Sequence, residues 1–156
     1  QDGGTANYYA GWSLVVVYGT EAAAETGARS VTVYDGGAWS GTSSAAPVFE
    51  FTAETGTRAT VGVVAWEGDR TATGDRLLLN GSALTPVGWD GSAGRSTNAF
   101  DSTATGWRFQ NSLGVDAKAF APVTMTSDLG SLSATTTGDQ YLLGVVTVES
   151  ELPATP

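Results

Sequence analysis

Residues 61–66 constrain the fold most, because these six residues include three valines and no polar side chain. Valine favours strands, and a short apolar run of this kind is typical of a strand that is buried on both faces. Glu67, Gly68 and Asp69 follow immediately, and Gly74 and Asp75 come soon after. We therefore expect a buried strand that ends at a surface loop rich in carboxylates.

The rest of the chain predicts an all-β fold. Short runs of Val, Thr, Tyr and Phe alternate with Gly, Asp, Asn and Ser, whereas helical periodicity is nearly absent. About nine or ten strands with mostly non-local pairing indicate a two-sheet β-sandwich of the Ig-like or jelly-roll kind, with at most one or two short helical turns. We expect a single domain over residues 1–148 and a tail or linker over 149–156.

Hydrophobic alternation and turn residues predict the individual elements. The expected strands cover residues 12–18, 30–34, 48–53, 58–66, 77–79, 82–84, 123–126, 131–136 and 140–148. Val31 and Val33 are expected to point inward, and Asn80 and Gly81 fit a tight hairpin turn. Apolar residues at three-to-four spacing predict a short helix over 111–120. The expected core contacts involve Trp12, Val16, Val63, Trp66, Leu78 and Val146.

Composition excludes several functional classes. Seven basic and sixteen acidic residues give a net charge of −9, which disfavours binding to nucleic acid or to an anionic membrane surface. The chain has no cysteine, so neither a disulfide nor a thiolate is available, and no apolar run is long enough to insert into a membrane. Its first residues lack the basic and apolar regions of a signal peptide, so we expect any such peptide to be absent here.

Catalysis is not expected. The chain has no histidine and no cysteine, which removes the usual general base near neutral pH and the thiolate nucleophile. A pair of carboxylates can hydrolyse glycosides, and Glu50, Glu54 and Glu67 are the candidates for such a pair. Glu50 and Glu54 are better explained as residues of a solvated strand face, so the expectation is a protein that is not an enzyme.

A calcium site is the first binding hypothesis. Glu67, Asp69 and Asp75 fall within nine residues of one loop, and calcium accepts six to eight oxygen ligands in irregular geometry. The spacing is not that of an EF-hand. The alternative is that these residues form turns while Arg70 or Arg76 pairs with the acids. By the same reasoning, turn formation is expected of Asp35, Asp90, Asp116 and Asp139.

A carbohydrate site is the second binding hypothesis. Trp39, Trp89 and Trp107 lie in stretches rich in Gly and Ser, and glycan sites on β-sandwiches use aromatic side chains as platforms. The alternative is that these rings anchor their loops to the core. Apart from calcium, no cofactor is expected.

Covalent crosslinks within the chain are not expected. An isopeptide bond would have to use Lys118, the sole lysine, which the predicted helix places on its polar side. A thioester needs cysteine, and a Thr–Gln ester would have to involve Gln110 or Gln140. Near the C-terminus, residues 152–155 resemble the start of a sortase motif, but Pro156 stands where glycine is required. We therefore expect a linker there.

Seven blocks of the sequence carry a resemblance to a known family: residues 9–18, 29–36, 61–69, 73–81, 98–102, 111–116 and 137–141. Together they resemble a domain of large exported surface proteins of actinobacteria and of other bacteria and archaea. The resemblance implies an extracellular or cell-surface location and a structural or adhesive role without established enzymatic activity. Such domains usually have a further β-rich segment before the block at 9–18.

Self-association follows as an expectation. A sandwich that begins at residue 12 without that preceding segment has an unpaired strand edge, and such edges readily pair with another chain. The ends at residues 1–7 and 149–156 are long enough to reach a neighbouring copy, since eight extended residues span roughly 26–29 Å. We therefore expect head-to-tail pairing into an open filament, with neighbouring modules as the other class of partner. The alternative function is a carbohydrate- or calcium-dependent adhesion module.

Overall fold

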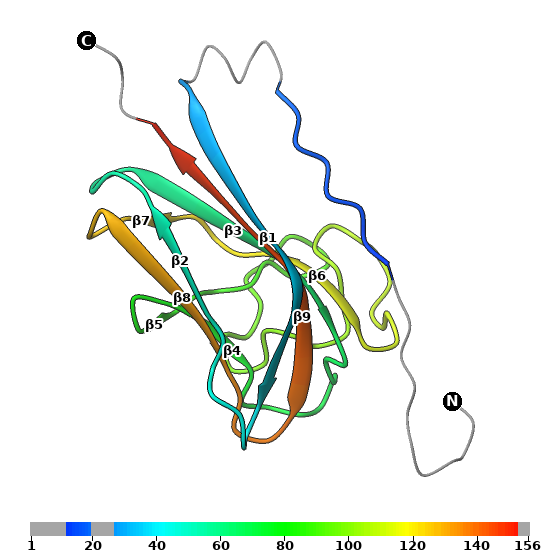
Figure 1. The fold of residues 1–156 in the computed structure, drawn as a ribbon. Coiled ribbons are helices and arrows are strands. Elements are labelled where there is room, and N and C mark those ends of the chain that lie inside the picture. The colour runs from blue at the N-terminus through cyan, green and yellow to red at the C-terminus, as the bar shows by residue number, and fades with distance from the viewer. Residues whose placement is uncertain (1–11, 20–26, 153–156) are drawn as a thin grey trace.

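The computed structural model describes residues 12–19 and 27–152, and this part of the chain folds as two antiparallel sheets that pack face to face (Figure 1). Its nine described strands and the absence of helices among the described residues confirm the predicted all-β sandwich. No helix in the described ranges is long and apolar enough to cross a membrane.

The first sheet has the strand order β1-β9-β3-β6, and β7 pairs with one end of β3. Its strands are β1 (Arg29–Gly41), β9 (Gln140–Glu151), β3 (Arg58–Trp66), β6 (Val115–Ala119) and β7 (Val123–Thr124). The second sheet has the order β2-β8-β4-β5. Its strands are β2 (Val48–Thr52), β8 (Leu129–Thr135), β4 (Arg76–Leu79) and β5 (Ser82–Ala83). Strand β9 continues to Glu151, three residues into the stretch predicted as a tail.

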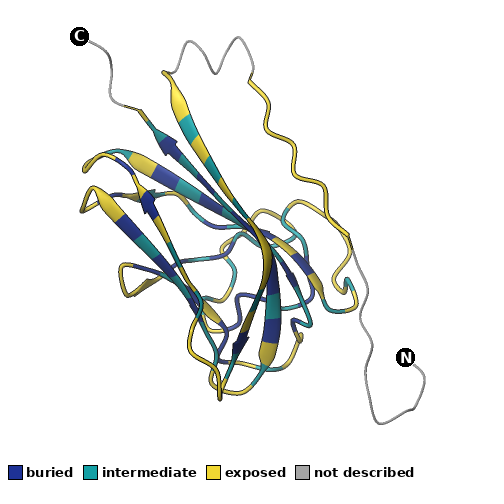
Figure 2. Cartoon of the chain, viewed as in Figure 1, coloured by how far each residue is buried: buried dark blue, intermediate teal, exposed yellow. Residues whose placement is uncertain are grey.

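The core lies between the two sheets and follows strand alternation. In β3, Ala59, Val61, Val63 and Ala65 are buried, whereas the residues between them are only partly buried (Figure 2). The prediction that residues 61–66 are buried on both faces is therefore wrong. No described segment packs closely over the outer face of the first sheet, so the apolar side chains on that face remain partly open to solvent.

Three aromatic rings fill the centre of the core. Phe100 contacts Tyr141 with ring centroids 4.5 Å apart and meets Phe120 edge-on at 6.5 Å. The predicted core residues Val63 and Val146 are buried beside them. Leu78 is only partly buried, because β4 turns Leu77 and Leu79 inward instead, so that prediction was displaced by one residue.

Segment 12–18 does not form the predicted first strand. Trp12 and Val16, both expected in the core, are exposed, and Trp12 has an exposed fraction of 87%. Val31 and Val33 also differ from the prediction, because β1 turns Ser30, Thr32 and Tyr34 inward and leaves both valines on the outer face. Hydrophobicity alone could not decide the face, since the inward residues of β1 are the more polar ones.

Two local predictions have opposite outcomes. The hairpin at Asn80 and Gly81 is confirmed, because both residues have positive φ angles, 48° and 80°, and Leu79 pairs with Ser82. The helix over 111–120 is wrong, because residues 115–119 form β6 and pair with β3. The strand turns Asp116, Lys118 and Phe120 inward, so that two charged residues are buried where sequence reasoning expects apolar ones.

Candidate functional site

An acidic cluster forms at one end of the sandwich. Glu67 follows β3 with a positive φ of 73°, Asp75 precedes β4, and Asp139 precedes β9. Asp75 is fully buried, and neither of its carboxylate oxygens accepts a hydrogen bond. Asp139 Oδ2 is also buried without a partner. Asp139, predicted only as a turn residue, thus lies close enough to Asp75 to raise the pKa of that carboxyl group.

Burial and mutual repulsion disfavour the charged forms in this cluster. Burial is the largest cause that raises the pKa of Asp75 to about 6, and the nearby charges of Asp139 and Asp69 raise it further. The Thr136 hydroxyl acts in the opposite direction and lowers this pKa, although it does not form a hydrogen bond with the carboxylate. Burial, with the charges of Asp139 and Asp69, likewise raises the pKa of Glu67. Asp75 is therefore uncharged in mildly acidic solution.

Two Thr-Gly-Asp triplets bring these acids together. Residues 73–75 and 137–139 have the same sequence, and their glycines pack against each other's threonines. A Cβ atom on Gly74 would lie 2.1 Å from Thr137 Oγ1, and one on Gly138 would lie 3.3 Å from the Thr73 carbonyl oxygen. The repeated triplet is a sequence signal that could have linked Asp139 to the loop.

The geometry as it stands does not assemble a calcium site. Glu67 is half-buried, Asp69 is exposed and Asp75 is buried, and no group of three acidic side chains in the described ranges is arranged to hold one ion. The alternative arginine pairing is not seen either, because the ion pairs of the described residues involve neither Arg70 nor Arg76. Glu50 and Glu54 are exposed and lie outside this cluster.

The three tryptophans of the carbohydrate hypothesis occupy different elements. Trp39 lies in β1 and not in a loop, and its ring is about half exposed on the outer face. Trp89 is partly buried. Trp107 is 57% exposed and packs against Phe109, 63% exposed, with ring centroids 5.4 Å apart. Within the described ranges, aromatic contacts join Trp107 to Phe109 but not to the other two tryptophans.

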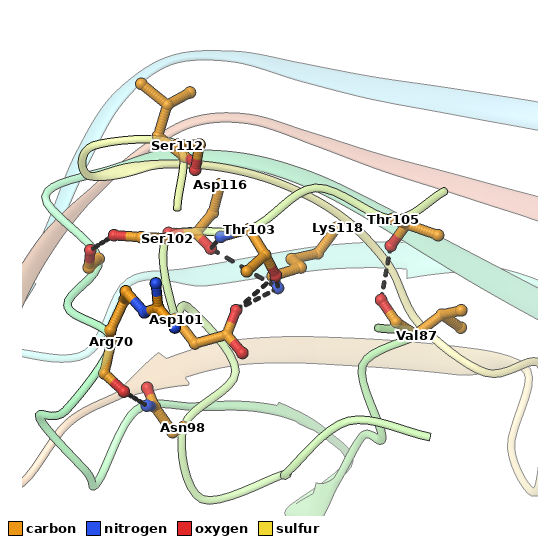
Figure 3. Close-up of polar contacts among 12 residues, drawn as sticks. Arg70, Val87, Asn98, Asp101, Ser102, Thr103, Thr105, Ser112, Asp116 and Lys118 are labelled. Carbon is orange, nitrogen blue, oxygen red and sulfur yellow. Dashed lines mark hydrogen bonds and ion pairs between the residues drawn. The ribbon is translucent and has the colours of Figure 1, made fainter. Parts of the chain in front are cut away.

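Charged side chains gather at the inward positions of β6, where none was predicted: Asp116 and Lys118 of the strand meet Asp101 (Figure 3). The Lys118 side chain is 2% exposed and its Nζ donates hydrogen bonds to Asp101 Oδ1 and to Thr103 Oγ1. Asp116 Oδ1 lies 3.7 Å from Lys118 Nζ and accepts a hydrogen bond from the Thr103 amide at 3.0 Å. The predictions for Lys118, on the polar side of a helix, and for Asp116, in a turn, are both wrong.

The segment 101–105 is fixed against β6 by backbone contacts. Ala104 pairs with Ala117 in a parallel bridge, and the Thr105 amide donates to the Ala117 carbonyl oxygen at 2.9 Å. The Ala119 amide in turn donates to Thr105 Oγ1 at 3.0 Å. These bonds set the spacing between Asp101 and Lys118, because each residue is anchored within a few positions of a backbone pair.

A groove separates segment 12–19 from the outer face of the first sheet. Its volume is about 770 Å³, and Val15, Val16, Val31 and Thr147 are among its lining residues. Figure 1 shows this segment, in dark blue, running apart from both sheets. Exposed apolar side chains therefore lie on both sides of an open groove.

Comparisons with protein-family models, with curated proteins and with solved structures returned no significant match.

Proposed function

We propose that this chain is a non-catalytic structural domain of an exported surface protein or extracellular fibre, and that copies join by strand addition. The observation that carries the proposal is the apolar segment 12–18, which stands away from the sandwich. Trp12, Leu14, Val16, Val17 and Tyr18 all have exposed fractions above 60%. Contiguous exposed apolar side chains of this size mark an interaction site in a soluble protein.

The acceptor is the free edge of β1 on a neighbouring copy. Among the described strands β1 pairs only with β9, so its other edge has unpaired backbone groups. The stretch of β1 before its bulge, residues 29–35, has the same length as segment 12–18, seven residues or roughly 23 Å as a strand. Added there, the segment would place its side chains beside the exposed Val31 and Val33.

Strand addition of this kind gives an open assembly. Donor and acceptor are different surfaces, so a joined pair of copies keeps one free donor at one end and one free acceptor at the other, and a filament results. The sequence-based expectation gave this role to residues 1–7 or 149–156, which lie mostly outside the described residues. Segment 12–18 is the better donor because its apolar character and its exposure are both established for the described chain.

Magnitudes indicate that several side chains must act together. Burying one large apolar side chain contributes about 1.5–3 kcal/mol, whereas association costs about 4–15 kcal/mol in lost freedom of motion. A charged residue introduced into segment 12–18 should therefore abolish assembly. It removes one apolar contact, and the charge itself must lose its hydration when the segment is buried.

Sedimentation velocity over a range of concentrations tests the proposal. The natural chain should form larger species as concentration rises, and Val16→Asp should remain a monomer. Trp107→Ser is the matched control, since it removes an exposed aromatic residue that belongs neither to segment 12–18 nor to β1, and it should assemble normally. A natural chain that remains monomeric at every concentration would refute the proposal.

A glycan-binding role is the second candidate, supported by the exposed pair Trp107 and Phe109. Stacked aromatic side chains offer apolar faces that a sugar ring can cover. Under this proposal, soluble glycans quench or shift tryptophan fluorescence in the natural chain and not in Trp107→Ala. An identical response of the two proteins to every glycan tested would exclude this site.

A further inference from the structure

We propose that Lys118 and Asp101 form an intramolecular isopeptide bond, and that Asp116 transfers the protons. The three side chains meet beneath β6, with Lys118 Nζ in contact with Asp101 Oδ1 and 3.7 Å from Asp116 Oδ1 (Figure 3). The inference concerns a modification within one copy, so it stands or falls independently of the assembly proposal.

Burial makes the ionised pair costly and the amide favourable. The Lys118 side chain is 2% exposed and that of Asp116 is not exposed at all, so charges here have lost most of their hydration. Condensation replaces the Lys118 ammonium and the Asp101 carboxylate with one neutral amide, which removes both charges of the ion pair. The Asp101 side chain is 32% exposed, which leaves the released water a route to solvent.

Asp116 has the environment of a proton-transfer group. Its Oδ2 is buried without a hydrogen-bond partner, which fits a protonated carboxyl group better than a carboxylate. Burial is the main cause that raises the pKa of Asp116 to about 7, against the opposing effects of Lys118 and the Thr103 amide. Burial also acts to raise the pKa of Asp101, but hydrogen bonds from Lys118 and Thr103 outweigh it and leave that pKa below its usual value. Asp116 is thus suited to hold and transfer a proton, whereas Asp101 is the carboxyl group that pairs with Lys118 and enters the new bond.

The reaction balances without an oxidant, a reductant or a cofactor. A proton passes from the Lys118 ammonium through Asp116 to an oxygen of Asp101, which leaves a neutral amine and a neutral carboxylic acid. The amine lone pair attacks Cγ of Asp101, and a new N–C bond forms as the carbonyl π bond opens. Asp116 then takes the second proton from nitrogen and gives it to the departing hydroxyl group. The C–O bond breaks, and the products are an amide and one water molecule.

The backbone holds the reacting groups in place. The Ala104–Ala117 bridge and the Thr105–Ala117 hydrogen bond fix the segment of Asp101 against the strand of Lys118. Such positioning replaces an encounter between free groups with a reaction inside one fixed structure. The resulting bond would tie residues 101 and 118 together and close the loop between them against β6.

Mass spectrometry of the intact, folded natural chain is the first test. We expect a mass below the sequence mass by one water, about 18 Da. Digestion with trypsin must locate the loss, because an aspartimide at an Asp-Gly pair also loses water. The expected product joins residues 96–108 to residues 109–156, since an amide at Lys118 blocks cleavage there. Cleavage after Lys118 in the folded natural chain, with no joined peptide, would overturn the proposal.

Variants separate the roles of the three residues. Lys118→Arg keeps the charge but should show no joined peptide. Asp101→Asn should give the same joined peptide with loss of ammonia instead of water, a change that a merely structural role cannot produce. Asp116→Asn should block the bond while the circular dichroism spectrum stays β-rich. Formation of the joined peptide in Asp116→Asn at the natural rate would show that Asp116 does not transfer the proton.

Discussion

Replacing Gly144 with alanine should destabilise the first sheet through a single side chain, that of Trp66. Gly144 is the extra residue of a bulge in β9, where the pairing with β3 shifts between Val64 and Ala65. A Cβ atom there would lie 1.6 Å from Cζ3 of Trp66 and 2.1 Å from its Cη2. The indole ring therefore covers the bulge and would have to move by an ångström or more.

The expected cost follows from packing. Inserting a methyl group into a filled site costs about 1–3 kcal/mol. Truncating a fully buried tryptophan costs about 3–5 kcal/mol, and Trp66→Ala should fall at or below the lower end because Trp66 is only partly buried. In the Trp66→Ala background Gly144→Ala meets no ring, so its added cost should fall to about zero. The coupling between the two changes should thus be about 1–3 kcal/mol.

Urea unfolding of the four proteins of this double-mutant cycle measures the coupling. Gly37→Ala is the matched control, because its Cβ atom would lie at an ordinary 3.4 Å from Leu142 Cδ1 on the same sheet. It should change the free energy of unfolding by less than about 0.5 kcal/mol. An equal cost of Gly144→Ala with and without Trp66 would refute the packing described for this bulge.

Three further predictions concern the acids and the core. The free energy of unfolding should fall as pH rises from about 4 to about 7, because Asp75 and Asp116 hold protons in the folded chain that the unfolded chain has released. Urea unfolding should show a decrease on the order of a few kcal/mol in the natural chain and a smaller decrease in Asp75→Asn. Melting curves with calcium and with EDTA should coincide, since no three acids of the described ranges converge; a calcium-dependent rise that Asp75→Asn removes would contradict this. Leu77→Ala should cost about 2–5 kcal/mol and Leu78→Ala distinctly less, because only Leu77 is fully buried.

Local chemistry made part of the fold predictable. A valine-rich apolar run identified β3 as a strand, and Asn80 with Gly81 identified the hairpin, because in both cases neighbouring residues determine the conformation. Which face of a strand is buried depends on the layers around it, and for β1 and residues 12–18 hydrophobicity gave the wrong answer. The outer face of the first sheet carries apolar side chains, such as Val31 and Val33, that remain exposed.

The buried charges of β6 also show that sequence alternation alone does not determine which side chains of a strand are buried. Asp116 and Lys118 occupy inward positions of β6, where an alternation rule expects apolar residues. Their burial is compensated by Asp101 and Thr103, residues that come from another segment and give no sign in the sequence of β6. The expectation that the chain has no crosslink placed Lys118 on the solvated side of a helix. In the structure Lys118 is instead a buried residue of strand β6.

Disulfide trapping tests the strand-addition account most directly, because the natural chain contains no cysteine to interfere. When Val16→Cys and Val31→Cys single variants are mixed under mild oxidation, the account predicts disulfide-linked dimers that contain one of each. A chain carrying both substitutions should form a ladder of head-to-tail oligomers, and Trp107→Cys paired with Val31→Cys should not. Closure of the double variant within single chains, with no mixed dimers, would contradict assembly between copies and show that segment 12–18 covers its own sheet.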